Sequence, residues 1–176
     1  RNPQQVAAQT QRMLKDPRAR AKIDEFFRHW LEMERATEMS KDVNTFPDFT
    51  DAVLADLRTS LEMFVDDVVW GPKSDYRQLL LADYIFLNGR LAKLYGGDLP
   101  EDSDFQKVSF NSKLRTGVIT HPYLLSVFAY HKSSSPIHRG VFLTRNIVGR
   151  ALKPPPMAIQ FMDDRFDPSL TMREKV

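Results

Sequence analysis

Apolar residues recur at three- and four-residue steps along much of the chain, which is the spacing of one face of an α-helix. The pattern predicts a short helix near the N-terminus and a second helix over about 17–37. Asp16 and Pro17 form a start signal for the second helix, because an aspartate side chain caps a helix and proline suits its first position. Ser135 and Pro136 repeat that signal later in the chain.

A long third helix is predicted after a loop over 40–47. Either Asp48 or Thr50 can cap this helix, and Gly71 with Pro72 is expected to end it. Burial of the apolar faces of the second and third helices would form one core. We predict that this core contains Phe27, Trp30, Leu57, Leu61 and Phe64.

The second half of the chain has shorter apolar runs. Asn88 and Gly96 are suited to begin and end one short helix, and Thr120 to cap another. The segments 105–110 and 114–119 flank a polar turn and are expected to pair as a hairpin. The predicted fold class is therefore mainly α, a helical bundle-like array with at most one small β-hairpin.

Composition excludes several kinds of chemistry. The 176 residues include no cysteine, so a disulfide scaffold, an iron–sulfur cluster and covalently attached haem c are not expected within the chain. No phosphate-binding glycine loop, nucleophile elbow or His-Glu-x-x-His motif occurs. We therefore expect no cofactor and no metal in this chain, and no catalysis by the chain alone.

The net charge of +2 conceals an asymmetry. Residues 1–104 carry an excess of acidic side chains, whereas 105–162 contains no Asp or Glu. Two interpretations stay open: the basic half docks on the acidic half, or it faces an external anion. The charge boundary and a polar, glycine-containing stretch predict four parts: 1–96, the C-terminal part of a first helical domain; 97–104, a linker; 105–157, a small basic helical domain; and 158–176, an extended tail.

The stretch before the helix at Pro136 is the strongest candidate for binding. A helix N-terminus attracts anions through its free N–H groups, and serine hydroxyls and cations would add to that attraction. The candidate anion-binding site comprises Lys132, Ser133, Ser134, Ser135, His138 and Arg139. The alternative is structural: a capped helix in which Arg139 supports the serine loop.

Other chemistry-bearing patterns have simpler structural explanations. Glu62 and Asp66 lie four residues apart on a helix, where a like-charge pair can raise a carboxyl pKa. A solvated acidic face explains the same spacing. The histidines His121, His131 and His138 lack a nearby cysteine or carboxylate in the sequence, which argues against a metal site.

An ordered series of motifs resembles a known pair of domains. The chain is similar to the paired domains of unknown function in large planctomycete-type cytochrome c proteins: the C-terminal part of the first and the whole of the second. The motifs are Asp16-Pro17-Arg18-Ala19, Phe46-Pro47-x-Phe49, Ala82-Asp83-Tyr84-x-Phe86-x-Asn88, Arg115-x-Gly117-Val118-Ile119-Thr120, Ser135-Pro136-x-x-Arg139-Gly140 and Pro154-Pro155-Pro156.

The resemblance implies an exported protein that is periplasmic or extracellular. It implies that haem c lies in an adjoining domain, which would begin just after this chain, and that the whole protein takes part in electron transfer, linked to polysaccharide degradation. No catalytic residue is implied. His121 stands where the family pattern has glutamine, which puts any shared role of this side chain in doubt.

Two functions are consistent with these observations. The first is a non-catalytic helical module that packs against and positions a haem-bearing neighbour. The alternative is the substrate-binding part of an extracellular oxidoreductase that acts on an anionic polysaccharide. The expected partners are neighbouring domains of the same protein and an anionic polysaccharide. A nucleic acid is not expected, because no recognition motif occurs, and no apolar run is long enough to span a membrane.

Overall fold

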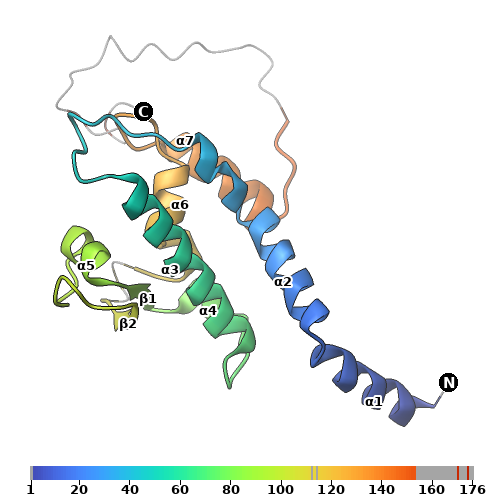
Figure 1. The fold of residues 1–176 in the computed structure, drawn as a ribbon. Helices are drawn as coiled ribbons and strands as arrows, with labels where there is room; N and C mark the ends of the chain where they lie inside the picture. The colour runs from blue at the N-terminus through green and yellow to red at the C-terminus, as the bar shows by residue number, and fades with distance from the viewer. Residues whose placement is uncertain (1, 112, 114, 154–169, 171–173, 175–176) are drawn as a thin grey trace. The chain divides into compact units, whose positions relative to one another are not determined.

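The structure is a computed structural model in which residues 2–111, 113, 115–153, 170 and 174 are described. The chain divides into two compact units, residues 1–37 and 38–176, and each is considered by itself. Over the described residues the chain is mostly helical and has one two-stranded antiparallel sheet (Figure 1). The predicted fold class is confirmed.

The first unit contains two helices, α1 (Pro3–Leu14) and α2 (Pro17–Trp30). The prediction that the second helix continues to about residue 37 is wrong. Glu32 has a φ of 52°, which lies in the left-handed region and interrupts the helix. The chain then forms a separate 3₁₀-helix, η1 (Met33–Glu38).

Among the described residues, four helices begin with a capping side chain followed by proline: Asn2-Pro3, Asp16-Pro17, His121-Pro122 and Ser135-Pro136. Each capping side chain accepts a backbone N–H from the first helical turn. The predicted caps at Asp16 and Ser135 are confirmed. The prediction that Thr120 caps a helix is wrong. Its hydroxyl accepts the Thr116 N–H at 2.7 Å, and His121 caps the helix that begins at Pro122.

The second unit is organised around α3 (Asp51–Trp70). This helix packs against β1 (Tyr84–Leu87), α5 (Gly89–Tyr95) and α6 (Pro122–Val127), as Figure 1 shows. Of the two predicted caps, Thr50 is the one that acts, since its hydroxyl accepts the N–H of the third helical residue at 3.3 Å.

The core of the second unit lies between α3 and the elements that cover it. Leu57, Leu61 and Phe64 have no solvent-exposed surface. The Phe64 ring lies 5.6 Å from the Tyr84 ring, measured between centroids, which ties α3 to the sheet. The predicted face of the third helix is therefore the buried one. That Phe27 and Trp30 of the first unit share this core stays a prediction.

The two-stranded sheet differs from the predicted hairpin. Its strands are β1 and β2 (Gln106–Ser109), with Tyr84 opposite Ser109, so the predicted pairing of 105–110 with 114–119 is wrong. Gly117 explains the difference: it has a φ of 51°, and its N–H donates to the carbonyl oxygen of Ala82 at 2.6 Å. A Cβ at this glycine would lie 2.2 Å from a backbone oxygen of α4 (Gln78–Leu81), so the chain turns onto α4 instead of back along β2.

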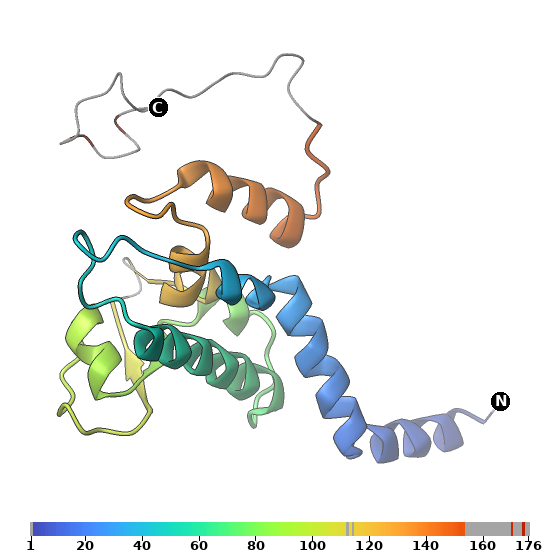
Figure 2. The same cartoon turned by 45° about the horizontal axis from the view of Figure 1, so that its top comes forward.

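The remaining elements complete the second unit. They are α4 (Gln78–Leu81), the 3₁₀-helix η2 (Val118–Thr120), α7 (Pro136–Phe142) and the π-helical turn η3 (Leu143–Ile147). In Figure 2 α6 lies between α3 and the α7–η3 segment. The latter ends before Gly149, which has a φ of 71°, as the sequence predicts.

The predicted domain organisation stays a prediction. The residues on both sides of the segment 97–104 belong to the second compact unit. The segment itself is held to α5, because the N–H of Gly89 donates to the carbonyl oxygen of Ser103 at 3.0 Å. The extended exit predicted at Pro154-Pro155-Pro156, and the tail that follows it, lie outside the described residues.

Candidate functional site

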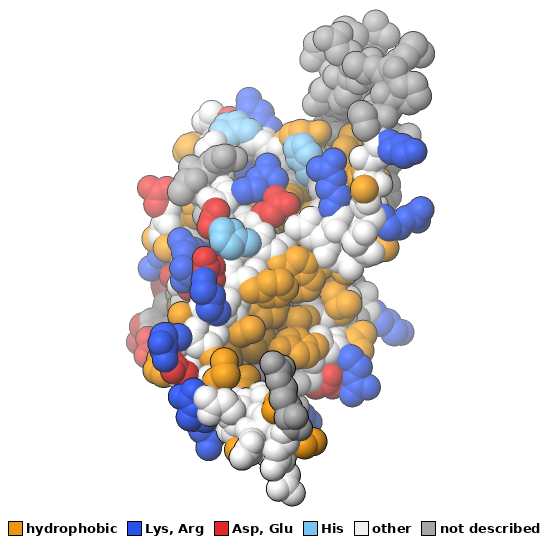
Figure 3. All heavy atoms as spheres, turned by 90° about the vertical axis from the view of Figure 1, so that its right-hand side faces the viewer, with side chains coloured by type: hydrophobic (Ala, Val, Ile, Leu, Met, Phe, Trp, Pro, Cys, Tyr) orange, Lys and Arg blue, Asp and Glu red, His pale blue; other side chains and the backbone are white. Residues whose placement is uncertain are grey.

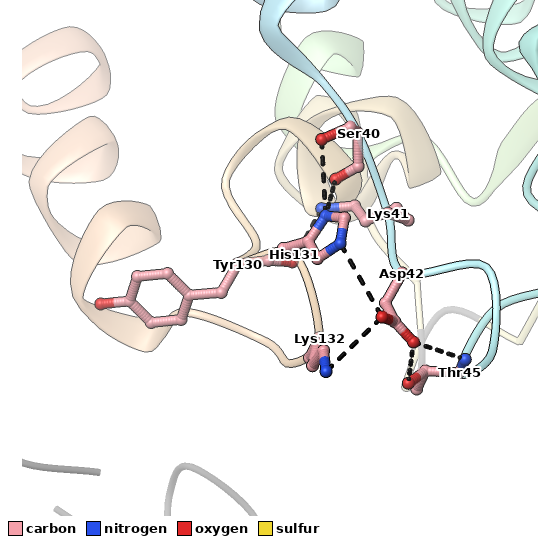
Figure 4. A network of polar contacts seen from close by, with 7 residues as sticks. All are labelled: Ser40, Lys41, Asp42, Thr45, Tyr130, His131 and Lys132. Atoms are coloured by element: carbon pink, nitrogen blue, oxygen red, sulfur yellow. Dashed lines mark hydrogen bonds and ion pairs between the residues drawn. The ribbon is translucent and has the colours of Figure 1, made fainter.

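The segment before α3 is fastened to the loop that precedes α7 (Figure 4). We call the fastening residues the clasp: Ser40, Lys41, Asp42, Thr45, Tyr130, His131 and Lys132. The Asp42 N–H donates to the His131 carbonyl oxygen at 3.1 Å, and His131 Nδ1 lies 3.1 Å from the Ser40 carbonyl oxygen. The clasp thus joins two segments that are distant in sequence.

Asp42 supplies the negative charge of the clasp. One carboxylate oxygen accepts the N–H and the hydroxyl of Thr45 at 2.9 and 2.8 Å, and the other lies 3.5 Å from the Lys132 ammonium nitrogen. The hydrogen bonds from Thr45, followed by the attraction of Lys132, lower the pKa of Asp42. Asp42 is therefore a fixed anion, and Lys132 is already paired with it.

Lys41 supports the end of α6. Its ammonium group donates to the carbonyl oxygens of Ser126, Ala129 and Tyr130 at 2.9, 3.2 and 3.0 Å. An ammonium group has three donors, so all of them are used. Burial lowers the pKa of Lys41, and the carbonyls at a helix C-terminus are a favourable place for a cation. Lys41 therefore has a structural task.

The six residues of the predicted anion site do not converge on one point. Ser135 is fully buried, and its hydroxyl accepts the His138 N–H at 3.2 Å. The His138 ring packs 5.0 Å from the Tyr130 ring, and Lys132 pairs with the clasp carboxylate. Arg139 Nε donates to the Ser135 carbonyl oxygen at 3.4 Å, which is the contact expected if this arginine supports the loop. Anion binding by these residues stays a prediction.

A groove lies between α6 and α7 and has a volume of about 750 Å³. Its floor is formed by Phe128 and Phe142, whose rings stack with centroids 4.5 Å apart. Leu125 and Leu143 form partly exposed walls, and Arg139 lies at the edge. Of the predicted anion site, the structure brings only Ser134 and Arg139 to this groove.

The structure also brings together a serine and a histidine. His121 is fully buried, its Nδ1 accepts the Tyr123 N–H at 3.2 Å, and its Nε2 lies 3.2 Å from Ser60 Oγ. Since Nδ1 is an acceptor, the proton of the neutral ring is on Nε2, which donates to Ser60; the Ser60 hydroxyl in turn donates to the carbonyl oxygen of Phe86. A general base would need a free Nε2, so this pair is a structural link and not a catalytic dyad.

The electrostatics of His121 agree with that assignment. Burial, followed by the positive charge of Arg115, lowers the pKa of His121 to about 3. The ring is therefore neutral at physiological pH, and its hydrogen bonds join α6 to α3.

The acidic face of α3 is also accounted for by local partners. Glu62 pairs with Arg58 at 3.2 Å. The Asp67 carboxylate accepts the Tyr84 hydroxyl and pairs with the Lys107 ammonium group, each at 2.7 Å. Burial acts to raise the pKa of Asp67, but the hydrogen bonds from these two groups outweigh burial and lower it. A lowered pKa does not suit Asp67 to act as a general acid.

Within the described ranges, no group of three or more His, Asp and Glu side chains could hold a metal ion. No helix in the same part of the chain is long and apolar enough to cross a membrane. Figure 3 shows cationic and anionic side chains interspersed on the visible face of the molecule.

Sequence reasoning missed the clasp and the groove walls. The sequence predicts 40–47 only as a loop, because the partners of Lys41 and Asp42 lie far along the chain. The position of Leu125 beside Leu143 depends on how two helices pack, which no local pattern specifies. A lysine and an aspartate in an otherwise featureless loop were the only local signal.

Comparison with protein families gives two matches. The family PSD4, described as a protein of unknown function (DUF1592), matches residues 1–96, which is more than half of the chain. The chain belongs to the PSD4 family. Residues 115–176 match a second family, PSCyt3, also described as a protein of unknown function (DUF1588). The resemblance to a pair of domains of unknown function is thus confirmed for this PSD4 protein. No curated protein and no solved structure matched.

Proposed function

We propose that this chain is a non-catalytic helical module of an exported, multidomain c-type cytochrome-like protein, and that it packs against and positions a haem-bearing neighbour. The observation that carries the proposal is that reactive side chains are engaged in structural hydrogen bonds. Ser60, His121 and Lys41 each have a structural partner, and the Ser60–His121 pair has the wrong tautomer for base catalysis. A periplasmic or extracellular location belongs to the same proposal.

The apolar groove between α6 and α7 gives this proposal a contact surface. Partly exposed leucines beside stacked phenylalanines offer an apolar surface that another protein can cover. A module that positions a neighbour needs such a surface and needs no catalytic group.

One observation favours the alternative, the substrate-binding part of an oxidoreductase acting on an anionic polysaccharide. The exposed cations Arg145, Arg150 and Lys153 lie in a stretch without any acidic residue. Such a surface attracts polyanions at low ionic strength.

The test of the main proposal uses the intact gene product that carries this chain, produced in a host that attaches haem c. We expect a haem stain that survives denaturing electrophoresis, and lysine cross-links from Lys132 or Lys153 to the haem-bearing region. A product without haem, or one without such cross-links, would contradict the proposal.

A second measurement distinguishes the docking function from polysaccharide binding. Binding of polygalacturonate and of dextran sulfate to the isolated chain is measured at low and at physiological ionic strength. A docking module binds both weakly at either salt concentration. A polysaccharide-binding part binds at least one tightly, and its affinity falls steeply as salt screens the charges.

A further inference from the structure

The groove between α6 and α7 is open along one side and apolar inside. Phe128 and Phe142 are buried in its floor, whereas Leu125 and Leu143 remain partly exposed along its walls. A small ligand would keep much of its own surface in water here, since small-molecule sites enclose most of what they bind. A segment of another protein would cover the exposed leucines from outside.

The charge at the edge of the groove is not balanced within the described residues. Arg139 uses Nε for the Ser135 carbonyl oxygen, and its two terminal nitrogens contact no carboxylate in the described part of the chain. The surrounding stretch, 115–153, contains no Asp or Glu at all. A guanidinium fork is suited to a carboxylate, so a partner that carries an Asp or Glu would complement the charge at this edge of the groove.

Gly140 lines the same groove. It lies inside α7, where glycine is among the least favourable residues. Its φ is not positive, and a Cβ built on it would meet nothing within 4 Å. A helical glycine that faces open space leaves a bare backbone surface, which another chain can approach closely.

We propose that this groove binds a protein segment whose apolar side chains lie over Phe128 and Phe142 and whose Asp or Glu carboxylate pairs with Arg139. The inference rests on the proposed docking function and specifies its contact surface. A second copy of this chain is disfavoured as the occupant, because a twofold contact through the groove would bring two Arg139 cations together.

The first experiment is selection from a random peptide display library on the isolated chain. The expected peptides combine apolar residues with a neighbouring Asp or Glu. Peptides selected on the Arg139→Glu variant should carry Lys or Arg in place of the acidic residue. The Leu125→Asp variant should enrich no peptide. Arg145→Glu, which changes an exposed cation that does not line the groove, is the matched control and should select the original peptides.

The second experiment measures the affinity of the best selected peptide together with the melting temperature of each variant. Arg139→Ala should weaken binding roughly tenfold or more, as expected for a lost charge-assisted hydrogen bond. Arg139→Lys should weaken it less, because the charge remains. Gly140→Ala should raise the melting temperature and weaken binding, a combination that a purely structural glycine would not produce.

The proposal is overturned if no peptide is enriched, if the enriched peptides lack acidic residues, or if Gly140→Ala and Arg139→Ala bind as tightly as the parent. Dimerisation of the chain that Leu125→Asp abolishes would also overturn it, in favour of a second copy. If the intact gene product carries haem and cross-links to its haem region while the groove binds no acidic peptide, this inference fails and the docking function stands.

Discussion

Around α3, Ser60 and His121 are buried and hydrogen-bonded to each other and to the backbone. At the groove, Arg139 makes one long contact with a carbonyl oxygen and meets no carboxylate among the described residues. Both regions were candidates for chemistry, but only the second leaves a functional group available. The difference shows that a reactive residue type indicates function only when the fold leaves it without an internal task.

The largest expected effect is in the α3 core. Phe64→Ala should lower the free energy of unfolding by roughly 3–5 kcal/mol, because it removes a fully buried ring and leaves a cavity. Urea denaturation measures the loss. Phe46→Ala is the control, since its ring is 41% exposed and its removal should have little effect. Equal stability of Phe64→Ala and the parent would show that the core assignment of α3 is wrong.

Next in size is the buried polar link. His121→Leu should lower the free energy of unfolding by roughly 2 kcal/mol, because the Tyr123 N–H loses its acceptor. His121→Gln keeps an acceptor and a donor in one side chain and should cost less. A glutamine variant as unstable as the leucine variant would contradict the hydrogen-bonding role.

The same histidine predicts a pH dependence. Burial lowers the pKa of His121 from 6.5 to about 3, so the unfolded state binds more protons between these values. Stability should therefore fall as the pH is lowered from 6.5 towards 3, and His121 should add no pH dependence above 6.5. The slope from this group is at most about 1.4 kcal/mol per pH unit. The difference between the parent and His121→Gln, measured by urea denaturation across that range, should show it; parallel curves would contradict it.

The sequence predicted what is local and missed what is distant. The caps at Asp16, Thr50 and Ser135 depend on residues within one helical turn, so short motifs suffice to predict them. The partner of β2 lies across α5 and the 97–104 segment, and no local pattern specifies it.

The candidate site divides in the same way. The sequence selected Arg139 from its place after a helix start, but its neighbours Leu125 and Leu143 come together only through the packing of α6 on α7. Lys41 was missed because a lysine that donates to three carbonyls has the same local sequence as one in solvent.

A change in the clasp should have a smaller effect on stability than the changes in the α3 core. Lys41→Ala should lower the free energy of unfolding by roughly 1–2 kcal/mol, since three carbonyl oxygens at the end of α6 lose a charged donor. Thermal unfolding measures it, with the exposed Lys153→Ala as control. If both variants have the same melting temperature, Lys41 does not stabilise the end of α6.

The smallest expected effect is at the start of α7. Ser135→Ala should cost about 1 kcal/mol, because the hydroxyl that accepts the His138 N–H is lost. Ser133→Ala, two residues earlier in the same loop, is the control and should be neutral. If Ser135→Ala has the same melting temperature as the parent, the Ser135 cap does not stabilise α7.

Hydroxyl-radical footprinting of the intact gene product, compared with the isolated chain, tests most directly that the groove is the docking surface. Side-chain oxidation of Leu125 and Leu143 should fall in the intact product, while the exposed Tyr76 and Leu81 should oxidise at the same rate in both. Equal oxidation of the two groove leucines in both samples would contradict the account.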